Sequence, residues 1–319
     1  MKSVSISLII PSFNRGRLIG ETLDSALAQS MPFAEIIVVD DGSSDSTLQV
    51  LATYGDKIRV LPLTNGGVQR ARNRGVALAT GHYIALCDSD DLLAPGFVEK
   101  TTGYLHEHSD TDAVYCNFVT FNNSGVQADK FSLAPAGFFE GATCRGEFLA
   151  DVPDLYLRTL NFQPLFMSGC LVKRTFYEAL GGFNTAFNDV GAEDWEFTLR
   201  VVGTGKVALC STVLAKVRKH PGNESTDTIR QVIGTATILE YALTAHSVAI
   251  SHRKEVVDNI AYRRSLVFQE AFAQGRFDLA EEMLSLLKDK KADLKFLLKV
   301  WIMRLPAALR QRAWRLTQQ

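Results

Sequence analysis

Three carboxylates stand within four residues at Asp88-Ser89-Asp90-Asp91, directly after the apolar run Tyr83–Cys87. A short apolar run of this kind is typical of a buried strand. Carboxylates packed this closely repel one another unless a cation neutralises them, and oxygen ligands suit hard cations such as Mg²⁺ or Mn²⁺. A metal at the carboxyl end of a buried strand is well placed to bind a diphosphate. The alternative is a solvated turn in which Asp90 or Asp91 caps the next helix.

A second acidic turn follows the β-branched run 35–39, where Asp40-Asp41-Gly42 leads into a segment rich in serine. Carboxylates at this place can accept hydrogen bonds from a base or a ribose, but they do not favourably meet phosphate without a metal. The alternative is turn and helix-capping chemistry alone, with Gly42 supplying an unusual backbone angle.

The segments that carry these turns alternate between strand and helix patterns. We predict a first strand that Pro11 stops, and the same alternation continues to residue 87. The predicted strands cover residues 4–10, 35–39, 58–62 and 83–87, and the predicted helices cover 18–30, 47–54 and 69–79. This order predicts an α/β domain with a mainly parallel sheet. The loops Pro11–Arg15, Asp40–Thr47 and Asp88–Asp91 then lie on one rim and form one site.

The sequence excludes two common nucleotide-binding loops. No GxGxxG follows the first predicted strand, which disfavours a dinucleotide fold, and no GxxxxGK[ST] is present, which excludes a P-loop. Further along, we predict a helix at 95–106, strands at 113–119, 166–174 and 207–217, and a long loop or hairpin at 122–143.

Glu193-Asp194 opens another predicted helix, and His220 follows the predicted strand 207–217. One of the two carboxylates can accept a proton from a substrate hydroxyl, although acids at a helix start are also favoured by the helix dipole alone. Trp195 either stacks on a sugar or belongs to the core. A lone histidine is more often structural than a metal ligand, so both roles stay open for His220.

Composition narrows the class of protein. The 319 residues carry a net charge of −1, so the chain has no overall attraction for nucleic acid. Five scattered cysteines, none in a CxxC pair, indicate reduced thiols rather than a disulfide framework or a zinc site. With no run of about 18 apolar residues and no signal-peptide pattern, we expect a cytoplasmic protein.

Four motifs in this order and spacing resemble the family 2 glycosyltransferases of GT-A fold. The motifs are Leu8–Asn14, Ile37–Asp45, Asn65-Gly66-Gly67 with Ala71–Gly75, and Asp88–Asp91. The resemblance covers roughly residues 4–225 and implies a nucleotide-sugar donor, a divalent metal and inversion at the anomeric carbon. Phe13 departs from the family, which often has tyrosine there.

The resemblance also implies roles for individual residues. Asp194 would be the catalytic base, with Glu193 as the second candidate, and Asp90 and His220 would bind Mn²⁺ or Mg²⁺, with Asp88 as a further ligand. Trp195 would contact the acceptor. The implied donor-binding residues are Pro11, Phe13, Asn14, Asp40, Asp41, Arg72, Asp88 and Ser89.

We therefore predict a GT-A catalytic domain at 1–225, with a nucleotide-binding half at about 1–115 and an acceptor half at about 116–225. The predicted reaction moves a hexose, glucose from UDP-glucose, to a saccharide or lipid-linked acceptor in surface or exopolysaccharide biosynthesis. The alternatives are a sugar-1-phosphate nucleotidyltransferase and a non-catalytic sugar-nucleotide-binding protein. A processive polymer synthase is disfavoured because the QxxRW motif is absent.

Residues 226–319 are predicted to be a helical extension. Leu294, Leu297, Leu298, Trp301, Ile302 and Leu305 form one apolar stripe beside basic residues, and Pro306 separates it from a second basic helix. A basic amphipathic helix pair at Lys288–Arg315 can lie on an anionic bilayer, which predicts peripheral contact with the inner face of the plasma membrane. Packing against the catalytic domain or a second subunit is the alternative.

Overall fold

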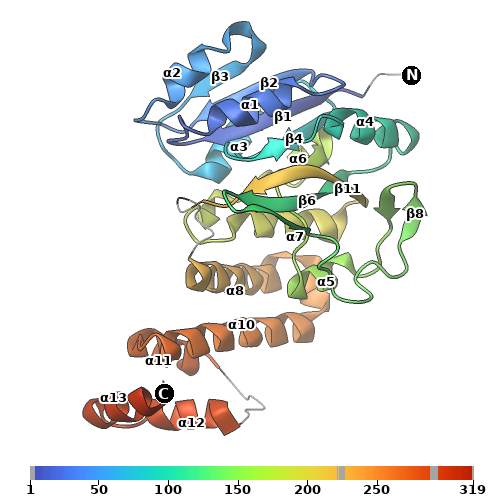
Figure 1. Cartoon of the computed structure of the whole chain (residues 1–319). Helices are drawn as coiled ribbons and strands as arrows, with labels where there is room; N and C mark the ends of the chain where they lie inside the picture. Colours follow the sequence, from blue (N-terminus) through green and yellow to red (C-terminus); the bar gives the residue numbers. More distant parts are fainter. Residues whose placement is uncertain (1–3, 221, 223–226, 288–293, 318–319) are drawn as a thin grey trace. The chain divides into compact units, whose positions relative to one another are not determined.

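The computed structural model describes residues 4–220, 222, 227–287 and 294–317 (Figure 1). The chain forms two compact units. The first comprises Met1–Asp189 and Asp194–Asn223, and the second comprises Val190–Glu193 and Glu224–Gln319.

The first unit is built on one mixed sheet with helices on both faces (Figure 1). Its strands within the described residues are β1 (Ile6–Ser12), β2 (Glu35–Asp40), β3 (Arg59–Pro62), β4 (Tyr83–Leu86), β5 (Leu92–Leu93), β6 (Ala113–Asn122), β7 (Gly125–Asp129), β8 (Thr143–Arg145), β9 (Phe148–Ala150), β10 (Cys170–Lys173) and β11 (Val207–Arg218). Its helices are α1 (Ile19–Leu27), α2 (Thr47–Ala52), α3 (Val68–Val76), α4 (Phe97–Glu107), α5 (Leu155–Asn161), α6 (Arg174–Ala179) and α7 (Glu193–Thr204), with 3₁₀ turns η1 (Gly55–Lys57) and η2 (Thr185–Phe187).

The strand order is β3-β2-β1-β4-β10-β6-β11-β9-β8, with β5 beside β11 and β7 beside β6. The predicted α/β fold is confirmed, and β1, β2, β3 and β4 pair in parallel as expected. The sheet becomes mixed at β10, which pairs antiparallel with both β4 and β6. In the predicted loop or hairpin 122–143, β6 and β7 form an antiparallel hairpin.

The period of two along β1 divides the core into two layers. Ile6, Leu8 and Ile10 face a cluster that includes side chains of α1, α2 and α4. Ile9 faces the opposite cluster, which includes side chains of α3, α5, α6 and α7. Burial on both faces explains why β1 is a continuous apolar run rather than an alternating one.

The prediction that Pro11 stops the first strand is wrong. Pro11 lies within β1 opposite Val39 of β2, and Ser12 opposite Asp40 extends the ladder further. Proline removes only its own N–H from the ladder. The N–H of Asp41 donates to the Ser12 carbonyl at 2.8 Å, so the pairing of β1 with β2 continues past the proline.

The second unit is helical, as predicted. Its helices within the described residues are α8 (Thr228–Ala245), α9 (Ser247–Ser251), α10 (Arg253–Ala273), α11 (Phe277–Ser285), α12 (Leu294–Met303) and α13 (Ala307–Leu316). They share a core that includes Phe268 and Phe272 of α10 and Ile302 of α12. Lys288, where the predicted basic pair begins, lies outside the described residues. Among the helices that the structure describes, none is long and apolar enough to span a bilayer.

Candidate active site

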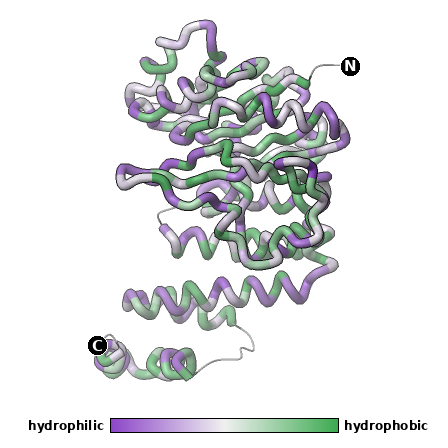
Figure 2. Tube along the Cα trace, turned by 45° about the vertical axis from the view of Figure 1, so that its right-hand side comes forward, coloured by the Kyte–Doolittle hydropathy of each residue, from purple (hydrophilic) through white to green (hydrophobic). Residues whose placement is uncertain are grey.

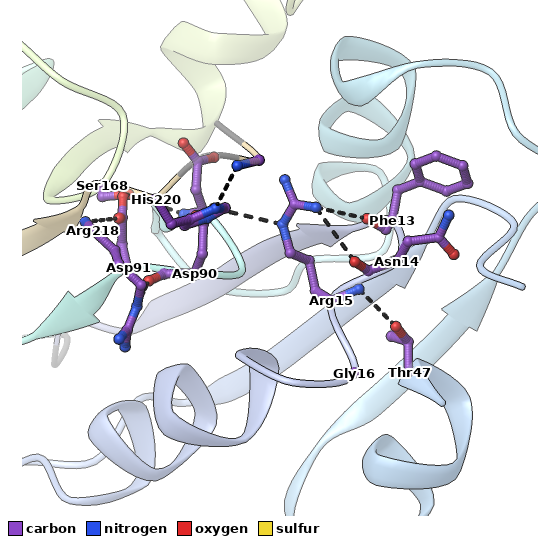
Figure 3. Close-up of polar contacts among 12 residues, drawn as sticks. Phe13, Asn14, Arg15, Gly16, Thr47, Asp90, Asp91, Ser168, Arg218 and His220 are labelled. Atoms are coloured by element: carbon purple, nitrogen blue, oxygen red, sulfur yellow. Dashed lines mark hydrogen bonds and ion pairs between the residues drawn. The ribbon is translucent and has the colours of Figure 1, made fainter. Parts of the chain in front are cut away.

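The loops after β1 and β2 are joined by hydrogen bonds between backbone N–H groups and side chains. The Asn14 N–H donates to Ser43 Oγ at 2.9 Å. The Arg15 N–H donates to Thr47 Oγ1 at 2.8 Å (Figure 3). Asn14 adopts a left-handed φ of 52°, which turns the chain sharply after Phe13. Phe13 is 44% exposed, so its side chain is accessible to a planar ligand.

Asp40 and Asp41 are both buried, but their carboxylates do different things. Asp41 accepts hydrogen bonds from the N–H groups of Gly66 and Gly67, the shortest at 2.8 Å, and so holds the loop before α3. Asp40 Oδ2 accepts one bond from the Ser43 N–H at 3.1 Å. Its Oδ1 is buried and has no hydrogen-bond partner among the described residues. A buried acceptor without a donor is costly, so Asp40 offers a place for a ligand N–H or O–H.

Asp88 is neutralised by a buried cation. Arg72 of α3 is only 4% exposed, and its Nη2 lies 2.7 Å from Asp88 Oδ1. The same guanidinium lies over the Phe183 ring, 5.1 Å from the centroid, so its position is fixed by packing as well as by charge. Such a pair orients the carboxylate, because Arg72 cannot move away without leaving a buried charge.

Asp90 contacts two groups from distant parts of the chain. His220 Nε2 lies 3.0 Å from Asp90 Oδ2, and Arg15 Nε lies 3.5 Å from the same oxygen (Figure 3). The Gly222 N–H donates to His220 Nδ1 at 3.1 Å. In the neutral ring this places the proton on Nε2, between His220 and Asp90.

Asp91 is buried, and its hydrogen bonds attach the acidic loop to Ser168 and Arg218. Ser168 Oγ donates to Asp91 Oδ2 at 2.5 Å and accepts from the Asp88 N–H at 3.0 Å. The Arg218 N–H donates to Asp91 Oδ1 at 2.8 Å, and Arg218 Nε donates to the Asp90 carbonyl at 2.9 Å (Figure 3). Burial raises the pKa of Asp91 well above its ordinary value, and the charges of Asp88 and Asp90 raise it further.

These contacts determine which side chains of the acidic loop are available to bind a metal ion. Over the described residues, no group of three His, Cys, Asp or Glu side chains is placed to hold one. Asp90 and His220 do converge, which gives one carboxylate and one imidazole. This pair would fit a cation such as Mg²⁺ or Mn²⁺ after the ring proton of His220 moves from Nε2 to Nδ1 and the bond from the Gly222 N–H opens. Such a cation takes few protein ligands in phosphate-binding sites and completes its shell with substrate oxygens and water. Asp88 faces Arg72 instead.

Asp194 of α7 lies close enough to Arg72 and Asp88 to be coupled to both electrostatically. Burial raises the pKa of Asp194, the positive charge of Arg72 lowers it, and the negative charge of Asp88 raises it. Glu193, the second candidate, is the first residue of α7 and is grouped with the helical unit, whereas Asp194 is grouped with the sheet.

Three further predicted site residues are buried. Trp195 is only 3% exposed. A stacking role needs an accessible ring face, so this burial fits the alternative interpretation as a core residue. Ser89 and Pro11 are also buried, in the acidic loop and in β1 respectively.

Comparison with known proteins agrees with this geometry. Residues 7–155 match the sequence model of Glycosyl transferase family 2. Over these residues, which are a little under half of the chain, the sequence is similar to that of family 2 glycosyl transferases. An uncharacterized glycosyltransferase of Rickettsia typhi is 40% identical over 114 residues, which are 35% of this chain and 36% of that protein. An uncharacterized glycosyltransferase of Rickettsia bellii is 39% identical over 227 residues, 67% of this chain and 30% of that protein. The chain spans about a third of the length of these relatives.

Among solved structures, S. aureus TarS 1-349 in complex with UDP-GlcNAc has a TM-score of 0.64 and 20% identity, and the match covers 99% of this chain and 88% of that one. At this identity the similarity concerns the fold. It agrees with the mixed α/β sheet and the helical C-terminal region seen in this chain.

The structure adds contacts within the site that the sequence did not specify. Arg15 directly follows Asn14, a predicted donor-binding residue, so its place in the sequence already indicated that it could lie in the site. Ser168 and Asp91 contact each other across 77 residues of sequence, and a buried serine in a predicted strand carries no mark of such a contact. Arg218 binds the acidic loop through its backbone and its guanidinium.

Proposed function

We propose that this chain is a metal-dependent, inverting glycosyltransferase that moves a hexose from a UDP-sugar to a hydroxyl of a saccharide or lipid-linked acceptor. The observation that carries the proposal is the convergence, at the carboxyl ends of β1 and β4, of two groups of opposite chemistry. Asp90 lies between two nitrogen-bearing side chains, His220 and Arg15. Arg72 and Asp88 pair with each other, and the charges of both act on Asp194. The first group suits a departing diphosphate, and the second suits a base.

Asp194 is the base in this proposal. An acceptor hydroxyl attacks the anomeric carbon, its proton passes to the Asp194 carboxylate, and the bond from the anomeric carbon to the diphosphate oxygen breaks. Because burial raises the pKa of Asp194, its carboxylate is a stronger base than an ordinary aspartate. Attack on the face opposite the leaving group inverts the anomeric configuration.

The leaving diphosphate gains negative charge, and the chain supplies positive groups for it. Arg15 would turn from Asp90 to a phosphate oxygen, because its side chain is 27% exposed rather than part of the core. Asp90 and His220 would hold Mg²⁺ or Mn²⁺, and such an ion supplies Lewis-acid stabilisation of the leaving group when it is bound.

The nucleoside would lie on the exposed Phe13 ring, with the unpartnered Asp40 Oδ1 accepting a bond from the base or the ribose. The sequence led us to expect UDP-glucose as the donor. The UDP-GlcNAc bound to TarS supports UDP-GlcNAc as the rival donor, and both share the same UDP portion. Transfer to an acceptor in surface or exopolysaccharide biosynthesis remains part of the proposal.

The test is release of UDP from a panel of UDP-sugars in the presence of Mn²⁺, with and without candidate acceptors. We expect release with UDP-glucose or UDP-GlcNAc that depends on Asp194, and normal release by the control variant Asp56→Asn, which changes an exposed aspartate elsewhere in the same unit. Pyrophosphate release from UTP and a sugar 1-phosphate would instead identify a nucleotidyltransferase. Binding of UDP without turnover under all of these conditions would identify a non-catalytic protein.

A further inference from the structure

Helix α12 is apolar on two opposite sides. One side packs into the core of the helical unit through Ile302 and Met303, and the Phe296 ring meets the Phe268 ring at a tilt, with 5.0 Å between ring centroids. The other side consists of Leu294, Leu297, Leu298 and Trp301, which we call the α12 stripe. These side chains are 85%, 51%, 49% and 57% exposed, respectively. Their spacing of three and four residues places them on one face of the helix.

The segment that carries the α12 stripe is strongly basic. Residues 294–317 contain six lysines and arginines and no aspartate or glutamate. The exposed ones are Lys295, Arg304, Arg312 and Arg315. Helix α13 continues the same surface chemistry with the exposed Leu309 and Leu316. Figure 2 shows this mixture as alternating hydrophobic and hydrophilic turns near the C-terminus.

The two helices are held in place by the rest of their unit. Trp314 Nε1 donates to the Phe272 carbonyl at 2.6 Å, and the Trp314 ring meets Phe277 edge to face at 5.9 Å. Arg310 lies over the Phe277 ring and 3.9 Å from Glu281. These contacts already hold α12 and α13 against the rest of their unit. The α12 stripe is therefore exposed on helices that are packed in place.

We infer that the α12 stripe, together with the basic residues of α12 and α13, is a docking surface for an anionic lipid bilayer. Exposed leucines and a tryptophan beside an entirely positive polar face are the features of helices that lie in a membrane interface. The polar headgroups would meet the exposed lysine and arginines, and the leucines would enter the boundary of the acyl chains. Helix α12 has ten residues, so it lies on the bilayer rather than crossing it.

Charge argues against a second copy of the chain as the occupant. An isologous contact through the α12 stripe would bring the four exposed positive charges of one copy, on Lys295, Arg304, Arg312 and Arg315, against the same four of the other. No acidic residue in this segment could compensate, whereas the headgroups of an anionic leaflet neutralise all of them.

The experiment is co-sedimentation of the full chain with vesicles of phosphatidylglycerol and phosphatidylcholine, compared with vesicles of phosphatidylcholine alone. We expect binding to the anionic vesicles at low salt and release at high salt. Leu298→Glu with Trp301→Glu should weaken partitioning by at least about tenfold. Arg312→Gln with Arg315→Gln should weaken it by about 30-fold, because each basic residue contributes about a factor of five.

The control is Val126→Glu, which places the same charge at an apolar residue of β7 that is 63% exposed and should leave binding unchanged. Trp301 emission should shift to the blue on anionic vesicles, and the Trp301→Phe variant should bind without that shift. Wild-type protein that stays in the supernatant at low salt would overturn the inference, as would unchanged binding of the charge variant. Self-association that the Leu298→Glu, Trp301→Glu variant abolishes, without vesicle binding, would assign the surface to a second copy.

Discussion

Replacing Asp194 by Asn tests the proposed base with little change in shape. Asparagine has nearly the same shape as aspartate and keeps one side-chain oxygen that can accept hydrogen bonds. It cannot accept a proton at neutral pH. We therefore expect the rate of transfer to fall by about 10²–10⁴, the range for loss of a general base, while UDP binding is kept.

The raised pKa of Asp194 adds a prediction about stability with a definite sign. A carboxyl group whose pKa is higher in the folded protein than in the unfolded chain stabilises the fold below its unfolded pKa. That contribution is lost as the pH rises through the folded pKa. Each unit of difference corresponds to about 1.4 kcal/mol. At neutral pH, Asp194→Asn should therefore increase the free energy of unfolding, and this gain should disappear in acid.

The assays are UDP release as a function of pH, calorimetric binding of UDP, and urea denaturation at pH 7 and at about pH 4. For the wild type, kcat should fall in acid with a midpoint above that of an ordinary aspartate. A near-wild-type rate for Asp194→Asn would refute the assignment and make Glu193 the next candidate. If Asp194→Asn lowers the free energy of unfolding by the same amount at neutral pH and in acid, the charged carboxylate of Asp194 is not disfavoured in the folded protein.

Three further predictions concern the loops around the acidic segment. Excess EDTA, or Asp90→Ala, should abolish transfer while the thermal melt followed by circular dichroism keeps its cooperativity; full turnover in excess EDTA would remove the metal from the mechanism. Ser168→Ala deprives the buried Asp91 of a donor at 2.5 Å and should lower the free energy of unfolding by about 1–3 kcal/mol, measured by urea denaturation. Arg72→Met leaves Asp88 without its partner at 2.7 Å and should weaken UDP binding measured by calorimetry; unchanged affinity would limit Arg72 to a structural role.

Sequence patterns were sufficient for the elements that position the site. The alternation of apolar strands and amphipathic helices up to residue 87 predicts β1 to β4 and α1 to α3, and each is present within a few residues of its predicted bounds. Parallel pairing then requires the loops after β1, β2 and β4 to meet at one edge. The hydrogen bonds of Asn14 and Arg15 to the loop after β2 show that two of these loops do meet.

The direction of β10 could not be predicted in the same way. An apolar run specifies a buried strand but not the orientation of its neighbours, and β10 lies between β4 and β6 although it follows both in the chain by more than 45 residues. The misjudged end of β1 has a related cause. Proline usually disrupts a ladder, yet here the neighbouring Ser12 and Asp41 restore the pairing that Pro11 cannot make.

The acidic loop shows why adjacent residues can have separate functions. From the sequence, Asp88, Asp90 and Asp91 form one cluster of repelling charges that calls for one cation. In the structure each has its own partner. Arg72 neutralises Asp88, His220 and Arg15 flank Asp90, and Asp91 is buried on Ser168 and the Arg218 N–H.

This division follows from local geometry, because the irregular backbone after β4 points successive side chains in different directions. Only Asp90 is directed toward groups that a bound diphosphate or cation could displace, whereas Asp88 and Asp91 are held by contacts that no ligand needs to break. A substrate that brings two phosphates and a cation adds little net charge to such a site. Asp90, His220 and Arg15 would rearrange around it, while the Asp88–Arg72 pair would keep its place beside Asp194.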